Sequence, residues 1–297
     1  MQITLLASLE AVLGIPEWAG FIFIFVLGAC IGSFLNVVIY RVPNGLSLLP
    51  GSACPNCKTS IRAYNNIPIF GWLMLGGKCS NCKEPIAWRY PAVELLTALV
   101  FCLVYWKIGL TPYLPVGLAF VSAMLALIFI DAEHMILPNV ITYPMFVIAL
   151  IMRVVYPILF TDANYFTDTT FAPIASLHGF PAWALSLAGA LFGALIGGGS
   201  LWLVGAVWKL LRGVEAMGLG DVKLLFGIGA LLGWRLTILT IFMGAFTGAI
   251  AGIFVVARQK DRDLQTQIPF GIFLGIGSIS ALLFGDQMIA WYLERFI

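Results

Sequence analysis

Two aspartates stand at the ends of apolar runs, where a charged side chain is costly. Asp131 closes the run in "LALIFIDAEHMILPN", and Asp221 opens the run in "GLGDVKLL". A third acid, Glu94 of "RYPAVELL", lies about one helical turn inside another apolar run. Ionisable residues within membrane segments are rare, and they usually serve function. These three acids are therefore the first candidates for chemistry.

Two carboxylates that meet in a partly desolvated site cannot both ionise easily, so they share a proton. Such a pair can act as acid and base on a water molecule, as in aspartic proteases, without a metal or a cofactor. Asp131 and Asp221 are predicted to form this catalytic pair. Gly218 and Gly220 remove side chains beside Asp221, which leaves room for the backbone of an extended peptide. Glu133 is two residues from Asp131 and projects from a different helix face, so it is the weaker partner.

A structural role is the alternative for each single acid. An aspartate that opens a helix can cap it and interact favourably with the helix dipole. Two acids on the same side of a membrane, one of them in a glycine-flanked turn, favour the catalytic interpretation for Asp221. Lys223 and His134 are interpreted as interfacial groups rather than catalysts.

Four cysteines form two close pairs in a hydrophilic stretch. The pairs are Cys54 and Cys57 of "CPNC" and Cys79 and Cys82 of "CSNC", with 21 residues between them. Two such turns can complete a tetrahedral thiolate site, for which zinc is the usual ion. Two disulfides, redox-active thiols or a metal cluster are the alternatives. The stretch is predicted to be cytosolic, where thiols stay reduced, which argues against disulfides. Four sulfur ligands leave no open position, so the predicted zinc, one per chain, is structural.

The composition requires a membrane for these residues. The chain has 297 residues, of which 61% are hydrophobic and only 10% are charged, against about 25% charged in soluble domains. The apolar runs are continuous, which favours helices over the alternating strands of a membrane barrel. We expect an all-α polytopic membrane protein with about eight transmembrane helices, near residues 18–40, 91–109, 114–131, 138–158, 182–208, 219–234, 236–257 and 268–284.

The basic residues predict the orientation, because cytoplasmic loops of membrane proteins carry an excess of Lys and Arg. If the stretch 41–90 is cytoplasmic, twelve basic residues lie inside. The outer side then receives only four, namely Lys107, Arg153, Arg235 and Arg295. This orientation puts both termini outside, and it puts Asp131 and Asp221 on the cytoplasmic side.

Three parts are expected along the chain. Residues 1–40 comprise an outer N-terminal segment and the first helix, which is interpreted as an anchor and not a removable signal peptide. Residues 41–90 form the cytoplasmic four-cysteine insert, for which bound metal can supply the missing folding energy. Residues 91–297 form a transmembrane peptidase bundle with an irregular outer loop at 159–181.

Assembled, these stretches resemble the type IV prepilin peptidases, the bifunctional leader peptidases and N-methyltransferases of bacteria. The resemblance covers nearly the whole chain and rests on motifs in one order: "GSFLNVVIYRVP" at 32–43, the two cysteine pairs, "WRYPAVELLTAL" at 88–99, "IDAEHMILPN" at 130–139, "GLGDVKLL" at 218–225 and "IPFGIFLG" at 268–275. "GSFLNV" or the GxGD pattern alone is a weak signal, but the ordered set is specific.

The resemblance implies that Asp131 and Asp221 are the catalytic aspartates. It further implies cleavage of a short basic leader from prepilins and pseudopilins at the cytoplasmic face of the inner membrane. The new N-terminus, usually phenylalanine, is then methylated with S-adenosylmethionine as donor. Two positions depart from the family pattern: Asn139 stands where an acid is common, and Ile272 stands where proline is common.

The methyl-donor site is not visible as a motif, because no glycine-rich turn follows a strand. Methylation is implied by the resemblance together with the intact cysteine insert. Glu94, Asn36 and Arg41 are candidates either for that site or for polar contacts within the bundle.

Three other functions are alternatives to this interpretation. A peptidase without methyltransferase activity and a non-enzymatic assembly factor of a secretion or pilus system are the main alternatives. An ion-coupled transporter is disfavoured, because the acids lie at the membrane interface rather than at its midplane.

Overall fold

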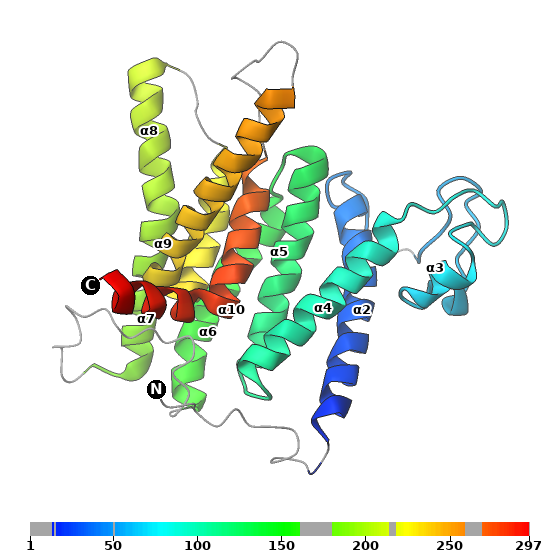
Figure 1. Cartoon of the computed structure of the whole chain (residues 1–297), viewed down its shortest axis with the longest axis horizontal. Helices are drawn as coiled ribbons and strands as arrows, with labels where there is room; N and C mark the ends of the chain where they lie inside the picture. The colour runs from blue at the N-terminus through cyan, green and yellow to red at the C-terminus, as the bar shows by residue number, and fades with distance from the viewer. Residues whose placement is uncertain are drawn as a thin grey trace. The chain divides into compact units, whose positions relative to one another are not determined.

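The fold is built almost entirely of helices, as Figure 1 shows for the computed structural model of the chain. The structure describes residues 14, 16–49, 51–160, 180–213, 218–258 and 269–296. Within these ranges no strand occurs, and two isolated antiparallel bridges are present in the cysteine insert. The helices are α2 (Glu17–Arg41), η1 (Ala63–Asn66), α3 (Phe70–Met74), α4 (Arg89–Ile108), α5 (Leu114–His134), α6 (Asn139–Leu159), α7 (Ala182–Ala194), η2 (Leu195–Gly199), α8 (Ser200–Arg212), α9 (Leu219–Arg258) and α10 (Phe270–Phe296).

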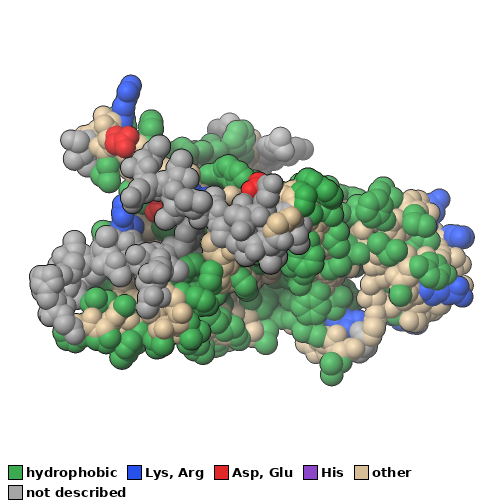
Figure 2. Space-filling model, turned by 90° about the horizontal axis from the view of Figure 1, so that it is seen from below, with side chains coloured by type: hydrophobic (Ala, Val, Ile, Leu, Met, Phe, Trp, Pro, Cys, Tyr) green, Lys and Arg blue, Asp and Glu red, His purple; other side chains and the backbone are tan. Residues whose placement is uncertain are grey.

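Seven helical segments of the described residues are long and apolar enough to cross a membrane when α9 is counted once. Hydrophobic side chains cover much of their visible surface in Figure 2, whereas several Lys and Arg side chains gather over the cysteine insert. An apolar surface of this extent suits lipid rather than water. The predicted fold class, a polytopic all-α membrane protein with the four-cysteine insert between its first two membrane helices, is confirmed.

The chain divides into two compact units, Met1–Ala126 and Leu127–Ile297, and α5 runs across the division. The predicted three-part division at residues 40 and 90 stays a prediction. Most of the predicted outer loop at 159–181 and most of the stretch "ARQKDRDLQTQ" lie outside the described residues.

In the first unit, α2 and α4 pack against each other as an antiparallel pair. A methyl group added at Gly28 would lie 2.7 Å from Cα of Ala98, and one added at Gly32 would lie 2.7 Å from Cα of Glu94. Such distances are too short for a real side chain, so the two glycines allow the helix backbones to touch. This close approach places the backbone of Glu94 directly against α2 at Gly32.

In the second unit, glycines also bring α7 and α9 into backbone contact. A methyl group at Gly193 would clash with the carbonyl oxygen of Gly229, and a methyl group at Gly229 would clash with the carbonyl oxygen of Gly193. The π-helical segment η2 continues α7 and lets Gly197 approach the carbonyl oxygen of Leu225. The span predicted at 182–208 is thus one continuous span, Ala182–Arg212, with an irregular centre.

Helix α9 contains a break that makes it two segments. Gly233 has φ 79° and ψ 172°, which are not helical angles. A straight helix of 40 residues would be about 60 Å long, twice the hydrocarbon core of a membrane. Gly197 approaches both Leu225, before the break, and Thr237, after it, so the two segments lie side by side there. The two spans predicted at 219–234 and 236–257 therefore correspond to the two parts of α9, drawn in yellow and orange in Figure 1.

A buried arginine stabilises this break. The Arg153 side chain on α6 is 3% exposed. Its guanidinium donates hydrogen bonds to the carbonyl oxygens of Ala230 at 3.1 Å and Leu231 at 2.9 Å. These carbonyls lose their helical partners where the first segment of α9 ends, and Arg153 satisfies them.

Candidate active site and metal centre

Asp131 and Asp221 come together in the second unit, from the last turn of α5 and the first turn of α9. Their carboxylates interact electrostatically. Asp131 is 5% exposed, and Asp221 is half-buried. Helix α9 begins at Leu219, so Asp221 lies within the first turn and is not the residue that caps the helix. The structure therefore brings together the two residues that the sequence placed in one catalytic pair.

The start of α10 holds the Asp131 carboxylate in place. The backbone N–H of Ile272 donates a hydrogen bond to Oδ2 of Asp131 at 3.1 Å, and the N–H of Gly271 also contributes. Free N–H groups at a helix N-terminus are a ready-made site for an anion. Among the described residues, no such donor reaches the Asp221 carboxylate. One acid is thus fixed by the backbone, and the other is left open to a bound molecule.

Glycines leave almost no spare space beside Asp131. A methyl group at Gly271 would lie 2.8 Å from Oδ2 of Asp131 and 3.1 Å from both Cδ atoms of Leu137. A methyl group at Gly220 would lie 3.1 Å from Cβ of Leu137, so this leucine packs between the two glycines. Gly218 has more room, because a methyl group there would meet Oδ2 of Asp221 at 3.7 Å. The open space predicted at both glycines beside Asp221 is therefore present at Gly218 and filled by Leu137 at Gly220.

Other polar groups near the pair differ in their placement. Glu133 is exposed whereas Asp131 is buried, which confirms that they project from different faces of α5. Lys223 donates a hydrogen bond to Oδ1 of Asn139 at 3.0 Å and lies 5.2 Å from the ring centre of Tyr143. The asparagine that departs from the family pattern thus pairs with a lysine of α9, a contact that sequence reasoning missed.

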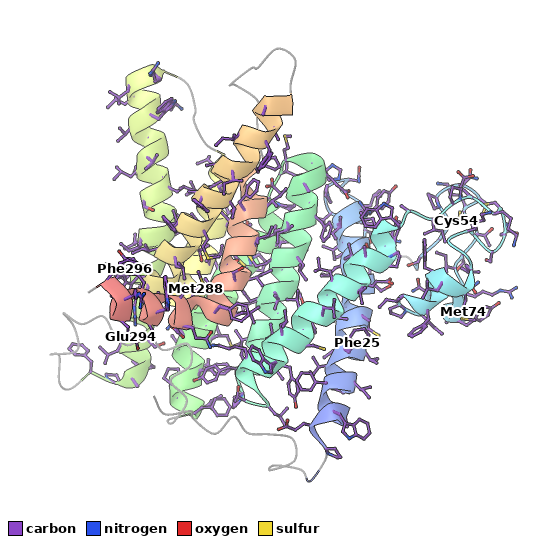
Figure 3. The ribbon with its side chains drawn as sticks, in the orientation of Figure 1. Phe25, Cys54, Met74, Met288, Glu294 and Phe296 are labelled. Atoms are coloured by element: carbon purple, nitrogen blue, oxygen red, sulfur yellow. The ribbon has the colours of Figure 1, made fainter. Side chains whose placement is uncertain are left out.

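Four sulfur atoms cluster in the insert of the first unit. The Sγ atoms of Cys54, Cys57, Cys79 and Cys82 all lie within 4.8 Å of one another. Two of the separations are 3.7 Å, between Cys54 and Cys82, and 4.0 Å, between Cys57 and Cys79. Zinc–sulfur bonds of about 2.3 Å place tetrahedral sulfurs roughly 3.8 Å apart. The cluster therefore fits a four-thiolate metal site, which lies among the insert loops where Figure 3 labels Cys54.

The two cysteine turns share one backbone pattern. In each turn, the carbonyl oxygen of the first cysteine accepts a hydrogen bond from the backbone N–H of the lysine that follows the second cysteine. The distances are 2.9 Å from Lys58 to Cys54 and 3.1 Å from Lys83 to Cys79. Both lysines have positive φ, 57° and 61°. The left-handed residue turns the chain back sharply, so that both sulfurs of a pair face the same point. Sequence spacing predicted the turns, but it did not predict a left-handed lysine in each.

Hydrogen bonds also prepare the thiols to ionise. The Thr59 hydroxyl, 3.3 Å from Sγ of Cys57, and the Thr59 backbone lower the pKa of Cys57 to about 5. The backbone N–H groups of Cys82 and Asn81 lower the pKa of Cys79. Desolvation and the neighbouring sulfurs outweigh a backbone hydrogen bond at Glu84 and raise the pKa of Cys82 to about 11. Crowded thiols ionise together only when a cation neutralises them, as a bound divalent metal does.

The three candidates for a methyl-donor site lie in different environments. The Arg41 guanidinium donates to the carbonyl oxygens of Ser47, Leu48 and Gly51, so it anchors the loop that leads to Cys54. Glu94 and Asn36 are buried where α2 and α4 meet. Arg41 thus makes structural contacts within the insert, and all three residues stay candidates for the methyl-donor site.

Comparison with known proteins identifies the family. The model of the Bacterial Peptidase A24 N-terminal domain matches residues 26–108, and the model of the Type IV leader peptidase family matches residues 118–253. Over 292 residues the chain is 40% identical to a protein of Pseudomonas aeruginosa named "Prepilin leader peptidase/N-methyltransferase", covering 90% of this chain and 91% of that protein. The chain belongs to the type IV leader peptidase family.

Two further relatives have the same name, prepilin leader peptidase/N-methyltransferase. A protein of Aeromonas hydrophila is 34% identical over 314 residues, covering 97% of this chain and 99% of its own length. A protein of Neisseria gonorrhoeae is 36% identical over 262 residues, covering 80% and 82%. No solved structure gives a significant match. The resemblance read from the motifs is confirmed.

The two family models divide the candidate residues between them. The N-terminal domain model spans all four cysteines and Glu94, and the leader peptidase model spans Asp131 and Asp221. Gly271 and Ile272, which donate to Asp131, lie beyond the second model. Their role was not predicted because a backbone N–H has no sequence signature, although the glycine in "IPFGIFLG" hinted at a close approach.

Proposed function

We propose that the chain is a membrane aspartic endopeptidase with Asp131 and Asp221 as its catalytic residues. Its substrates are type IV prepilins and pseudopilins, from which it removes the basic leader before it N-methylates the new N-terminus. The observation that carries the proposal is the meeting of these two carboxylates in a chain whose relatives are named prepilin leader peptidase/N-methyltransferase.

The proposed reaction is the general acid–base hydrolysis of one peptide bond. One carboxylate removes a proton from a water molecule, and the water oxygen bonds to the peptide carbonyl carbon. The second carboxyl group donates its proton to the substrate. The first carboxyl group then gives the proton it took from water to the leaving nitrogen, and the second carboxylate takes a proton back from an oxygen of the tetrahedral intermediate. The carbon–nitrogen bond breaks, which frees an amine and a carboxylic acid. The backbone donors of Gly271 and Ile272 keep Asp131 oriented during these steps.

The four cysteines are proposed to hold one zinc ion with a structural role. The sulfur separations and the lowered pKa values of Cys57 and Cys79 support this assignment. Bound zinc supplies cross-linking of two turns that have little apolar core of their own. Metal analysis of the purified protein should give about one zinc ion per chain, and iron in its place would contradict the assignment.

The site is proposed to face the cytoplasm from the bacterial inner membrane. The excess of Lys and Arg in the insert, together with Lys209 and Arg212 in the last turn of α8, supports this orientation. S-adenosylmethionine is the proposed methyl donor, and it is treated as a second substrate.

Mass spectrometry of a co-expressed prepilin tests the proposal, because it reports cleavage and N-methylation together. Asp131→Asn and Asp221→Asn each keep the side-chain size and remove the ionisable group. Each variant should reach the membrane at normal levels and leave the prepilin uncut. Normal processing by either variant would disprove the catalytic pair.

A further inference from the structure

Glu94 is a buried acid that the cleavage reaction does not use. It is 8% exposed, on α4 in the first unit. Its Oε2 accepts a hydrogen bond from the backbone N–H of Ile69 at 2.6 Å, and the Ser33 side chain of α2 also hydrogen bonds to it. A carboxylate has about four acceptor sites, so these two donors leave part of its capacity open.

Asn36 supplies a second buried acceptor close by. The residue is 3% exposed, and its Nδ2 donates to the carbonyl oxygen of Tyr90 at 3.0 Å. Its Oδ1 is buried and has no hydrogen-bond partner among the described residues. Asn36 lies one turn beyond Ser33 on α2, and Tyr90 lies one turn before Glu94 on α4. The two acceptors are therefore neighbours along one helix–helix seam.

An unpartnered buried oxygen is destabilising, so its presence calls for a ligand that donates a hydrogen bond. Beside a buried carboxylate, the ligand that satisfies both acceptors is a cation with several N–H groups. A sulfonium ion carries charge but no N–H, and it would leave Oδ1 of Asn36 unsatisfied. A primary ammonium supplies the charge and three donors.

We infer that Glu94 and Asn36 form a binding site for a primary α-ammonium group in the methylation reaction. The inference rests on the proposed methyltransferase function. Two molecules of that reaction carry this group: the N-terminus of the cleaved pilin and the amino-acid end of S-adenosylmethionine. The chemistry that Glu94 recognises is the same in both cases, and the KM values of the two substrates distinguish them.

If the group is the pilin N-terminus, Glu94 also takes part in the transfer. The ammonium gives one proton to the Glu94 carboxylate, and the nitrogen gains a free electron pair. The nitrogen bonds to the methyl carbon of the sulfonium while the carbon–sulfur bond breaks. The electron pair of that bond returns to sulfur, which leaves as a neutral thioether, and the methylated nitrogen carries the positive charge.

The insert covers this site with a strained residue. Ile69 precedes the short helix α3 and has φ 63° and ψ −57°, a conformation that is costly for a β-branched residue. Its N–H contact with Glu94 holds it there. Backbone strain is often stored where a segment must release a ligand. Movement of Ile69 would relieve the strain and open the way to Glu94.

Three variants of the full-length protein test the inference, each assayed with a purified prepilin and S-adenosylmethionine. Glu94→Gln keeps an oxygen for the Ile69 N–H but removes the charge, and it should lower the methylation rate at least tenfold while cleavage and metal content stay unchanged. Glu94→Asp keeps the charge and should retain more methylation than Glu94→Gln. Glu84→Gln, at an exposed acid of the insert, is the matched control and should behave as wild type.

The order of the methylation rates of Glu94→Gln and Glu94→Asp distinguishes a ligand-binding role of Glu94 from a purely structural one. If Glu94 serves only to hold the Ile69 N–H, Gln should replace it better than the shorter Asp, and that order would overturn the inference. Loss of cleavage or of metal together with methylation in Glu94→Gln would overturn it as well. A wild-type protein that cleaves without methylating would refute the methyltransferase function, and the inference with it.

Kinetics identify the source of the ammonium group. In Glu94→Asp, a raised KM for the cleaved pilin with an unchanged KM for S-adenosylmethionine assigns the site to the pilin N-terminus. The reverse pattern assigns it to the methyl donor. Unchanged KM values for both substrates would show that Glu94 binds neither.

Discussion

The carboxylate of Asp131 owes its position to the backbone of another helix. Ile272 and Gly271 donate to it from the first turn of α10, 141 residues further along the chain in the case of Ile272. A proline at position 272 would have no N–H to donate, so the isoleucine at this position allows the hydrogen bond to Asp131 of the proposed catalytic pair.

Gly271→Ala should impair cleavage by crowding Asp131. The new methyl group would lie 2.8 Å from Oδ2 of Asp131, so the carboxylate must rotate or α10 must shift. A displacement of about 1 Å at a catalytic group can lower a rate roughly 100-fold, and we expect a loss of roughly 10- to 100-fold in kcat/KM for a prepilin. Gly205→Ala on α8, where a methyl group meets no atom within 4 Å, is the control. Equal activity of the two variants would show that Asp131 tolerates the methyl group.

Thr59→Val should make the metal site more sensitive to acid. Metal binds the thiolate, and Thr59 lowers the pKa of Cys57 to about 5. Without the hydroxyl this pKa rises toward its ordinary value, so protons compete with the metal at a higher pH. Zinc release, followed with a chromogenic chelator during acid titration, should have its midpoint at a higher pH than in wild type. Thr59→Ser keeps the hydroxyl and should restore the wild-type midpoint, and a shared midpoint for all three proteins would contradict the role of Thr59.

At the scale of elements, the apolar runs predicted the membrane helices well because a span is encoded locally, by length and composition. The break in α9 was anticipated only as a gap between two runs. Its cause, Gly233 with φ 79°, and its stabilisation by Arg153 depend on a contact with α6. Sequence reasoning assigned Arg153 to the outer side as a topology charge, and it could not show that the side chain is buried against two carbonyls.

Arg153→Met should destabilise the second unit. The substitution leaves the Ala230 and Leu231 carbonyl oxygens without the donors that now reach them. Unsatisfied buried acceptors cost about 1–3 kcal/mol each, so for these two carbonyl oxygens we expect a loss of about 2–6 kcal/mol. Thermal unfolding of the purified protein in detergent measures the change. Arg295→Met, at an exposed residue of α10, should shift the midpoint by much less, and equal shifts would exclude a special role for Arg153.

At the scale of the whole molecule, the two proposed activities fall in different units. The four cysteines, Glu94 and Asn36 belong to residues 1–126, whereas Asp131 and Asp221 belong to residues 127–297. Residue types and spacings were enough to nominate all of these side chains. The contact between Asn36 and α4 depends on helix packing, and the hydrogen bond from Ile69 to Glu94 depends on a strained backbone angle. A single sequence displays neither of these.

Metal removal should therefore affect methylation more than cleavage. Ile69 lies between the two cysteine turns, so its position over Glu94 depends on the order that the metal imposes on the insert. Treatment with a strong chelator should lower N-methylation of a prepilin by a larger factor than its cleavage, and added zinc should restore it. Mass spectrometry of the same reaction measures both products. A chelated protein that still methylates normally would show that the insert does not control the Glu94 site.

The orientation of the molecule in the membrane can be tested by chemical labelling. Twelve basic residues on the insert side against four on the other favour a cytoplasmic insert and a cytoplasmic catalytic pair. In Figure 1, the C-terminal ends of α8 and α9 lie on the same side. Arg212 is exposed in the last turn of α8. Lys107 lies in the last turn of α4. In full-length protein, a membrane-impermeant maleimide should label Lys107→Cys in intact spheroplasts, and it should label Arg212→Cys only after permeabilisation. The unsubstituted protein corrects for its native cysteines. Labelling of Arg212→Cys in intact spheroplasts would place the proposed catalytic pair on the outer face, where a leader still in the cytoplasm could not reach it.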